Sequence, residues 1–106
     1  MREIDITAFA TALADGATVI DVREPFEYVT GHVPGARLVP LAQVPTYAPE
    51  LAKAGRVYVI CASGNRSKAA ADYLAKAGVD AWSVAGGTSA WAKAGRPLVR
   101  GTRAAA

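Results

Sequence analysis

The segment CASGNRS, residues 61–67, contains the residues whose types and spacing could do chemistry. Cys61 is the only cysteine in the chain, and it closes the apolar run VYVIC, residues 57–61. A helical pattern begins near Asn65, only a few residues later. The thiolate is the nucleophilic form of cysteine, and a helix N-terminus lowers the pKa of a nearby thiol. The segment therefore predicts a nucleophilic cysteine.

The loop between these two elements is suited to hold an anionic sulfur. Gly64 can adopt a positive φ, and Ala62 and Ser63 are small enough to let consecutive amides curl around an anion. Arg66 adds a fixed positive charge to the same loop. A buried structural thiol is the alternative interpretation, because free cysteine is among the residue types most often found in protein cores.

The elements that must position Cys61 help to decide between these interpretations. Short β-branched runs predict strands at 18–22, 36–41, 57–61 and 81–84. Helical patterns follow them or lie between them, at 5–16, 46–55, 65–78 and 87–95. This alternation predicts an α/β domain with a mainly parallel sheet that carries helices on both faces. Such sheets bind ligands at the carboxyl ends of their strands, where Cys61 lies, so its position favours a chemical role.

Length and composition are consistent with one domain over residues 1–100, followed by a flexible C-terminal tail at 101–106. The net charge of +3 comes from scattered basic residues, which predicts no nucleic-acid partner but mildly favours small anions. A single cysteine allows neither an intramolecular disulfide nor a Cys-rich metal cage. The first residues show no signal-peptide or membrane-spanning pattern, so a cytoplasmic location is expected. The sequence leaves the oligomeric state open.

Three motifs carry a resemblance to a known family. They are DVREPFEYVTGHVPGA (21–36), CASGNRS (61–67) and VAGGTSAW (84–91). In order and spacing they closely resemble a single-domain rhodanese, and together they span nearly the whole chain. The resemblance implies a three-layer α/β/α rhodanese-like domain with a mainly parallel five-stranded sheet. The fifth strand would be EIDI, residues 3–6.

The resemblance also implies an activity, sulfurtransferase of the rhodanese type. Cys61 would take the outer sulfur from a small anionic donor such as thiosulfate or 3-mercaptopyruvate and form a persulfide. Cyanide, a thiol or a protein acceptor would then remove that sulfur, which predicts ping-pong kinetics and needs no cofactor or metal. By position, the donor would be held by Ala62, Ser63, Gly64, Asn65, Arg66 and Ser67, with Arg23 as a further candidate.

Two other functions remain open from the residues. Cysteine-dependent phosphatases need a loop one residue longer than the four residues that separate Cys61 from Arg66, so the spacing favours sulfur over phosphate. A docking or sulfur-carrier module is the second alternative, although many docking domains of this family lack the cysteine. Many relatives have a basic residue where this chain has Ala62, which leaves the identity of the donor open. His32 is expected to fix the turn in which it lies.

Overall fold

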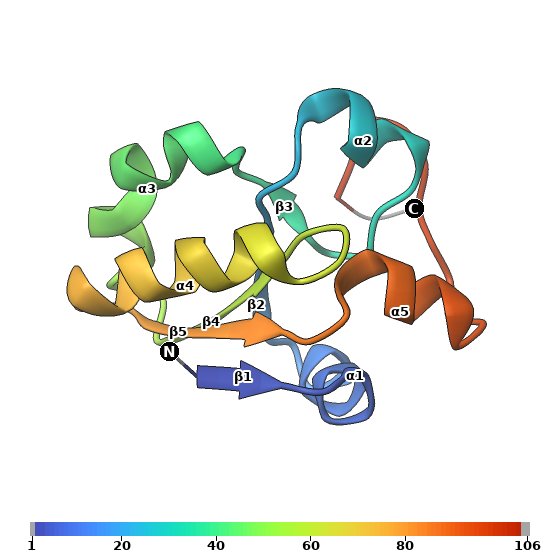
Figure 1. Cartoon of the computed structure of the whole chain (residues 1–106), viewed down its shortest axis with the longest axis horizontal. Coiled ribbons are helices and arrows are strands. Elements are labelled where there is room, and N and C mark those ends of the chain that lie inside the picture. Colours follow the sequence, from blue (N-terminus) through green and yellow to red (C-terminus); the bar gives the residue numbers. More distant parts are fainter. Residues whose placement is uncertain (1, 105–106) are drawn as a thin grey trace.

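The computed structural model describes residues 2–104, and its centre is a five-stranded sheet (Figure 1). The strand order is β1-β5-β4-β2-β3, and every neighbouring pair is parallel. The strands are β1 (Arg2–Ile4), β2 (Thr18–Asp21), β3 (Arg37–Leu38), β4 (Arg56–Ile60) and β5 (Asp80–Val84). The predicted parallel α/β architecture with a fifth strand at the N-terminus is therefore confirmed.

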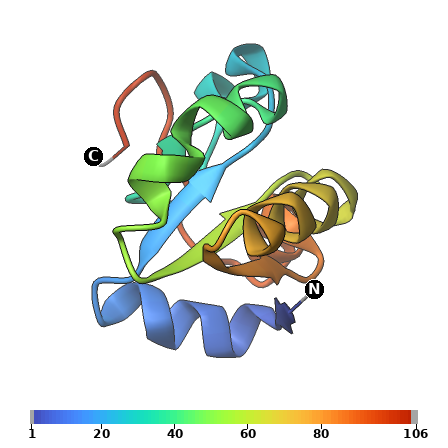
Figure 2. The same ribbon diagram turned by 90° about the vertical axis from the view of Figure 1, so that its left-hand side faces the viewer.

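Helices cover both faces of this sheet and complete a three-layer arrangement (Figure 2). One face carries α1 (Ile6–Ala14) and α5 (Gly87–Lys93), and the other carries α3 (Val44–Leu51) and α4 (Asn65–Lys76). The central strand β4 serves both cores, since Val57 and Val59 pack against α3 and α4 while Tyr58 and Ile60 pack toward α1 and α5. Burial on both faces explains why this strand is almost continuously apolar.

Several element boundaries differ from those that the sequence predicts. Strand β3 has only two residues instead of the expected 36–41, because Pro40 lacks an amide hydrogen and the chain turns into a short 3-10 helix, η1 (Leu41–Gln43). Helix α3 runs from Val44 to Leu51 and not over the predicted 46–55, and Pro49 lies inside it. Helix α2 (Pro25–Thr30) was not predicted as an element. It is too short to show a clear helical period.

The C-terminal segment lies against α2 and the turn that follows it. His32 forms an antiparallel bridge with Val99, the Gly101 amide donates to the Val29 carbonyl at 2.9 Å, and the Gly35 amide donates to the Ala104 carbonyl. The expected tail at 101–106 thus includes residues with backbone partners, and 105–106 lie outside the described residues. The fully buried His32 ring stacks on Tyr28 at 3.6 Å between ring centroids.

None of the helices among residues 2–104 has the length and apolar character needed to cross a membrane.

Candidate active site

The loop between β4 and α4 places Cys61 where a parallel sheet ends and a helix begins. Strand β4 ends at Ile60, and α4 starts at Asn65. Gly64, directly before the helix, has a φ of 110°, a value that L-residues with a side chain rarely adopt. This conformation turns the Gly64 amide toward the sulfur, so that its nitrogen lies 3.1 Å from Cys61 Sγ. The predicted glycine turn therefore supplies a backbone donor to the sulfur.

The Cys61 sulfur lies among groups that stabilise its negative form. The residue is only 1% exposed, and Ser67 Oγ lies 3.4 Å from Sγ. Burial raises the pKa of the Cys61 thiol, but hydrogen bonds from the Ser67 hydroxyl and from the amides of Ser67, Gly64 and Ser63 lower it by more in sum. The result is a pKa below the usual value for cysteine, as a nucleophile requires.

Ser83 supplies a second buried hydroxyl, next to that of Ser67, and it was not identified from the sequence. Its Oγ lies 2.8 Å from Ser67 Oγ, and both serines are fully buried. When the thiol is protonated, Cys61 donates to Ser67, which can donate to the Gly64 carbonyl. When the thiolate forms, Ser67 can turn its hydrogen to the sulfur and accept one from Ser83. A serine at a core position of an apolar strand was the available signal.

The turn between β5 and α5 holds the cysteine loop in place. Thr88 donates to the Cys61 carbonyl through both its amide, at 2.8 Å, and its hydroxyl, at 3.0 Å. The Ser89 amide donates to the Ala62 carbonyl at 2.9 Å. A Cβ atom at Gly87 would lie 2.5 Å from the Cys61 carbonyl oxygen, so only glycine lets the two segments approach this closely. The motif VAGGTSAW therefore holds the loop in place through hydrogen bonds to the carbonyls of Cys61 and Ala62.

Arg23 forms a buried ion pair with Asp21 at the carboxyl end of β2. Its Nε and Nη2 donate to the Asp21 carboxylate at 2.8–3.1 Å, and Nη2 also donates to the Gly31 carbonyl at 2.9 Å. The Arg23 side chain is 7% exposed and that of Asp21 is fully buried. Asp21 and Arg23 are therefore bound to each other. A contact between Arg23 and a donor stays a prediction.

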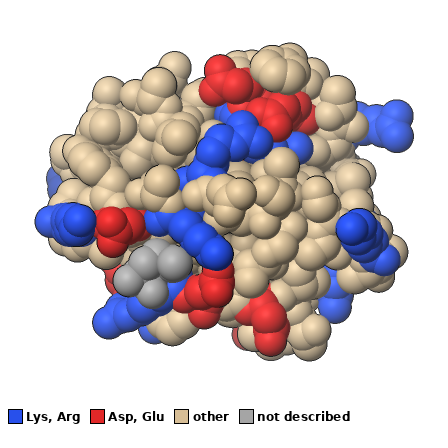
Figure 3. All heavy atoms as spheres, in the orientation of Figure 1, with Lys and Arg blue, Asp and Glu red and all other residues tan. Residues whose placement is uncertain are grey.

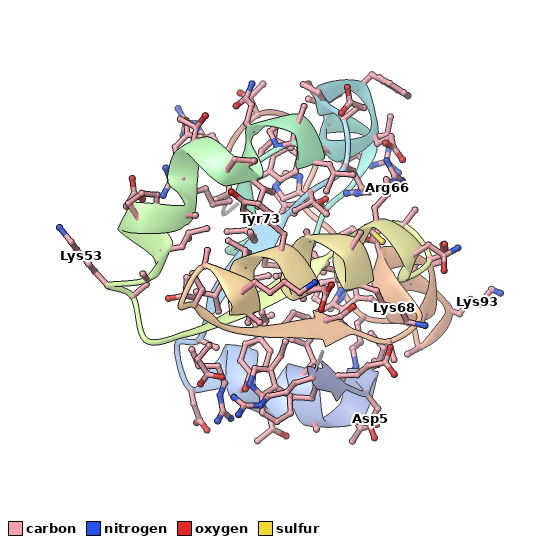
Figure 4. The ribbon with its side chains drawn as sticks, turned by 60° about the vertical axis from the view of Figure 1, so that its left-hand side comes forward. Asp5, Lys53, Arg66, Lys68, Tyr73 and Lys93 are labelled. Carbon is pink, nitrogen blue, oxygen red and sulfur yellow. The ribbon has the colours of Figure 1, made fainter. Side chains whose placement is uncertain are left out.

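Arg66 projects from the start of α4 toward α2, where it meets Glu27 (Figure 4). Its Nη1 and Nη2 donate to the two carboxylate oxygens of Glu27 at 2.7 and 2.9 Å. This hydrogen-bonded pairing lowers the pKa of Glu27 from 4.5 to about 2. Acidic side chains over α2 lie directly beside basic ones on this face of the molecule (Figure 3). Glu27 was not identified from the sequence, since 39 residues separate it from Arg66.

The remaining loop residues differ in how far they face solvent. Ser63 and Asn65 are exposed, Ala62 and Arg66 are half-buried, and Gly64 is buried. The loop thus has exposed and half-buried side chains beside a sulfur that is itself buried. Their contact with a donor, like that of Ser67, stays a prediction.

This geometry, a buried low-pKa cysteine in a loop between a parallel strand and a helix, agrees with a comparison of the sequence with known families. The sequence pattern of the rhodanese-like domain matches residues 5–94. The chain belongs to the rhodanese-like domain family. The family that the three motifs resembled is thus confirmed, and so is the fold that the resemblance implied.

Individual rhodanese-like relatives point to sulfur chemistry. A sulfurtransferase from Allochromatium vinosum is 35% identical over 102 residues, which cover 93% of this chain and 95% of the relative. A Bacillus subtilis protein whose name describes a sulfur carrier, YrkF, is 38% identical over 78 residues, or 72% of this chain and 42% of its own length. The crystal structure of a rhodanese-related protein from Thermoplasma volcanium has a TM-score of 0.86 at 33% identity, covering 93% of this chain and 98% of that one.

Proposed function

We propose that this rhodanese-like chain is a sulfurtransferase that carries sulfane sulfur on Cys61. The observation that supports this most directly is the lowered pKa of a buried thiol that has a backbone amide 3.1 Å and a serine hydroxyl 3.4 Å from its sulfur. These donors stabilise an anion without needing a separate general base. One relative named above is called a sulfurtransferase and another is named as a sulfur carrier, which supports the same reaction class.

The proposed reaction has two displacements. The Cys61 thiolate attacks the outer sulfur of a donor such as thiosulfate, forming a new S–S bond while the donor's own bond to that sulfur breaks and the remainder leaves with the electron pair. A thiol or cyanide then attacks the outer sulfur of the Cys61 persulfide and returns the thiolate. The loop amides that hold the thiolate can also hold the persulfide anion. Covalent capture followed by release predicts ping-pong kinetics.

The test is the intact mass of the protein after incubation with thiosulfate or with 3-mercaptopyruvate. The proposal predicts a gain of one sulfur that is lost on treatment with a reductant. Cys61→Ser is the matched control, because a hydroxyl replaces the sulfur with little change in shape. A gain that persists in Cys61→Ser would place the sulfur elsewhere, and no gain from either donor would contradict sulfurtransferase activity.

A sulfur-carrier function is the second candidate, and the similarity to YrkF favours it. A carrier would load sulfur on Cys61 in the same way but release it only to a protein partner. Steady-state turnover with cyanide or a small thiol therefore separates the two functions. Rapid turnover supports the enzyme, while a stable persulfide that neither acceptor discharges supports the carrier.

A further inference from the structure

Both arginines associated with the proposed site are already paired with carboxylates. Arg23 is bound to the buried Asp21, and Arg66 uses both terminal nitrogens on Glu27. The positive charge of each guanidinium is therefore balanced by a carboxylate. Among residues 2–104, the groups that hydrogen-bond to the Cys61 sulfur are neutral, namely loop amides and the Ser67 hydroxyl. Neutral dipoles stabilise a single negative charge on sulfur, but they do not balance an additional dianion.

Glu27 is fixed in place by its own helix. Its carboxylate accepts a hydrogen bond from the Glu24 amide at 3.0 Å, as part of a reciprocal capping box at the start of α2. The Glu27 side chain is 23% exposed, and its pKa of about 2 keeps it ionised at neutral pH. Arg66 responds mainly to Glu27, whose hydrogen bond raises the pKa of Arg66, and to a smaller extent to the charge of Cys61. Glu27 thus sets the charge that the Arg66 side of the loop presents.

We propose that Glu27 is a specificity-determining residue, which neutralises Arg66 and makes the site favour a singly charged sulfur donor over dianionic thiosulfate. This inference rests on the proposed sulfurtransferase function. 3-Mercaptopyruvate is a donor of the favoured kind, with one carboxylate. In its reaction the Cys61 thiolate bonds to the donor sulfur, the C–S bond breaks, and the electron pair stays on carbon as an enolate that water protonates to pyruvate. No oxidant or reductant is needed.

The experiment compares the second-order rate of persulfide formation with thiosulfate and with 3-mercaptopyruvate. In Glu27→Gln, one negative charge is lost and the amide oxygen can still cap α2. Coulomb energy scales with the product of charges, so a gain of about tenfold for the dianion corresponds to about threefold for the monoanion. The ratio of the thiosulfate rate to the 3-mercaptopyruvate rate should therefore rise about threefold.

Three further variants separate this effect from general changes in charge or folding. Glu24→Gln removes an exposed carboxylate at the N-cap of the same helix and should change the ratio less than twofold. Arg66→Met leaves Glu27 unpaired and should lower the ratio by about threefold. The double variant Glu27→Gln/Arg66→Met removes both charges and should return the ratio to within twofold of the parent value.

The outcomes distinguish this inference from the function on which it rests. If the parent protein forms a persulfide with both donors but Glu27→Gln leaves the ratio within twofold, the specificity role is wrong and sulfur transfer stands. An equal change of the ratio in Glu24→Gln also overturns it, because a general charge effect would then explain the result. If the parent protein takes sulfur from neither donor, both proposals fail.

Discussion

Replacing Ser67 with alanine should raise the pKa of the Cys61 thiol by about one pH unit. The Ser67 hydroxyl is fully buried, lies 3.4 Å from the sulfur, and is the largest of the influences that lower the pKa of Cys61. A hydrogen bond to a charged partner contributes about 1.5–3 kcal/mol, and a long contact to sulfur belongs at the lower end of that range. Since about 1.4 kcal/mol corresponds to one pH unit, the loss of this bond gives the stated change.

The assay is the rate of alkylation of Cys61 by iodoacetamide as a function of pH. This rate follows the thiolate fraction, so the midpoint of the profile reports the pKa directly. In Ser67→Ala the midpoint should move upward by about one pH unit. Ser63→Ala is the matched control, because Ser63 acts on the pKa of Cys61 through its backbone amide, which the substitution keeps.

The backbone contribution predicts what should remain in Ser67→Ala. The amides of Gly64, Ser63 and Ser67 still point to the sulfur, so the thiol should stay more acidic than it would be from burial alone. A midpoint that does not move would refute the role assigned to the Ser67 hydroxyl. A midpoint that falls would show that this hydroxyl stabilises the protonated thiol instead.

Three further substitutions, and one control, test the support around the site. Gly87→Ala should destabilise the fold by about 2–3 kcal/mol in urea unfolding, since its Cβ would lie 2.5 Å from a carbonyl oxygen at a φ of 58°. Gly95→Ala, with a φ of 75° but open space, should cost only about 1 kcal/mol, and equal losses would contradict the close-packing argument. Asp21→Asn should cost about 3–5 kcal/mol by the same measurement, because it leaves the Arg23 charge buried without its partner; a loss below about 1 kcal/mol would contradict this. The pKa of Glu27 is lowered from 4.5 to about 2, so its carboxylate stabilises the fold above about pH 4.5 and that contribution is lost as the pH falls toward 2. Unfolding of Glu27→Gln measured against pH should therefore lose less stability over that interval than the parent protein, and parallel curves would refute the assigned ion pair.

The sequence predicted the position of Cys61 between a strand and a helix because the relevant signals are local. An apolar run, one cysteine, a glycine and the start of a helical pattern lie within a few residues, and each has a direct backbone consequence. The structure places Gly64 in the left-handed conformation and starts α4 at Asn65, where the pattern indicated. The order of strands and helices was predictable for the same reason, since alternation along the chain restricts the topology of a parallel sheet.

The polar partners of the site were not predictable, because they come from distant parts of the chain. Glu27 meets Arg66 only because α2 packs beside the start of α4, and Ser83 meets Ser67 only because β5 lies next to β4. The end of β3 was also missed. The residues RLVP have a strand-like composition, but the strand ends at Leu38, and the chain forms η1 after Pro40, which has no amide hydrogen. Composition alone does not encode where the pairing between two strands ends.

These missed partners change what the loop can do. From the sequence, Arg66 was the main positive charge of the loop, and the identity of the donor stayed open. The structure instead pairs that charge with Glu27 and leaves backbone amides and a serine as the groups around the sulfur. Fixed dipoles in a buried loop are screened by salt much less than exposed charges are. The acidity of Cys61 should therefore change little with ionic strength, while discrimination between donors, which depends on the partly exposed pair of Arg66 and Glu27, should weaken as salt increases.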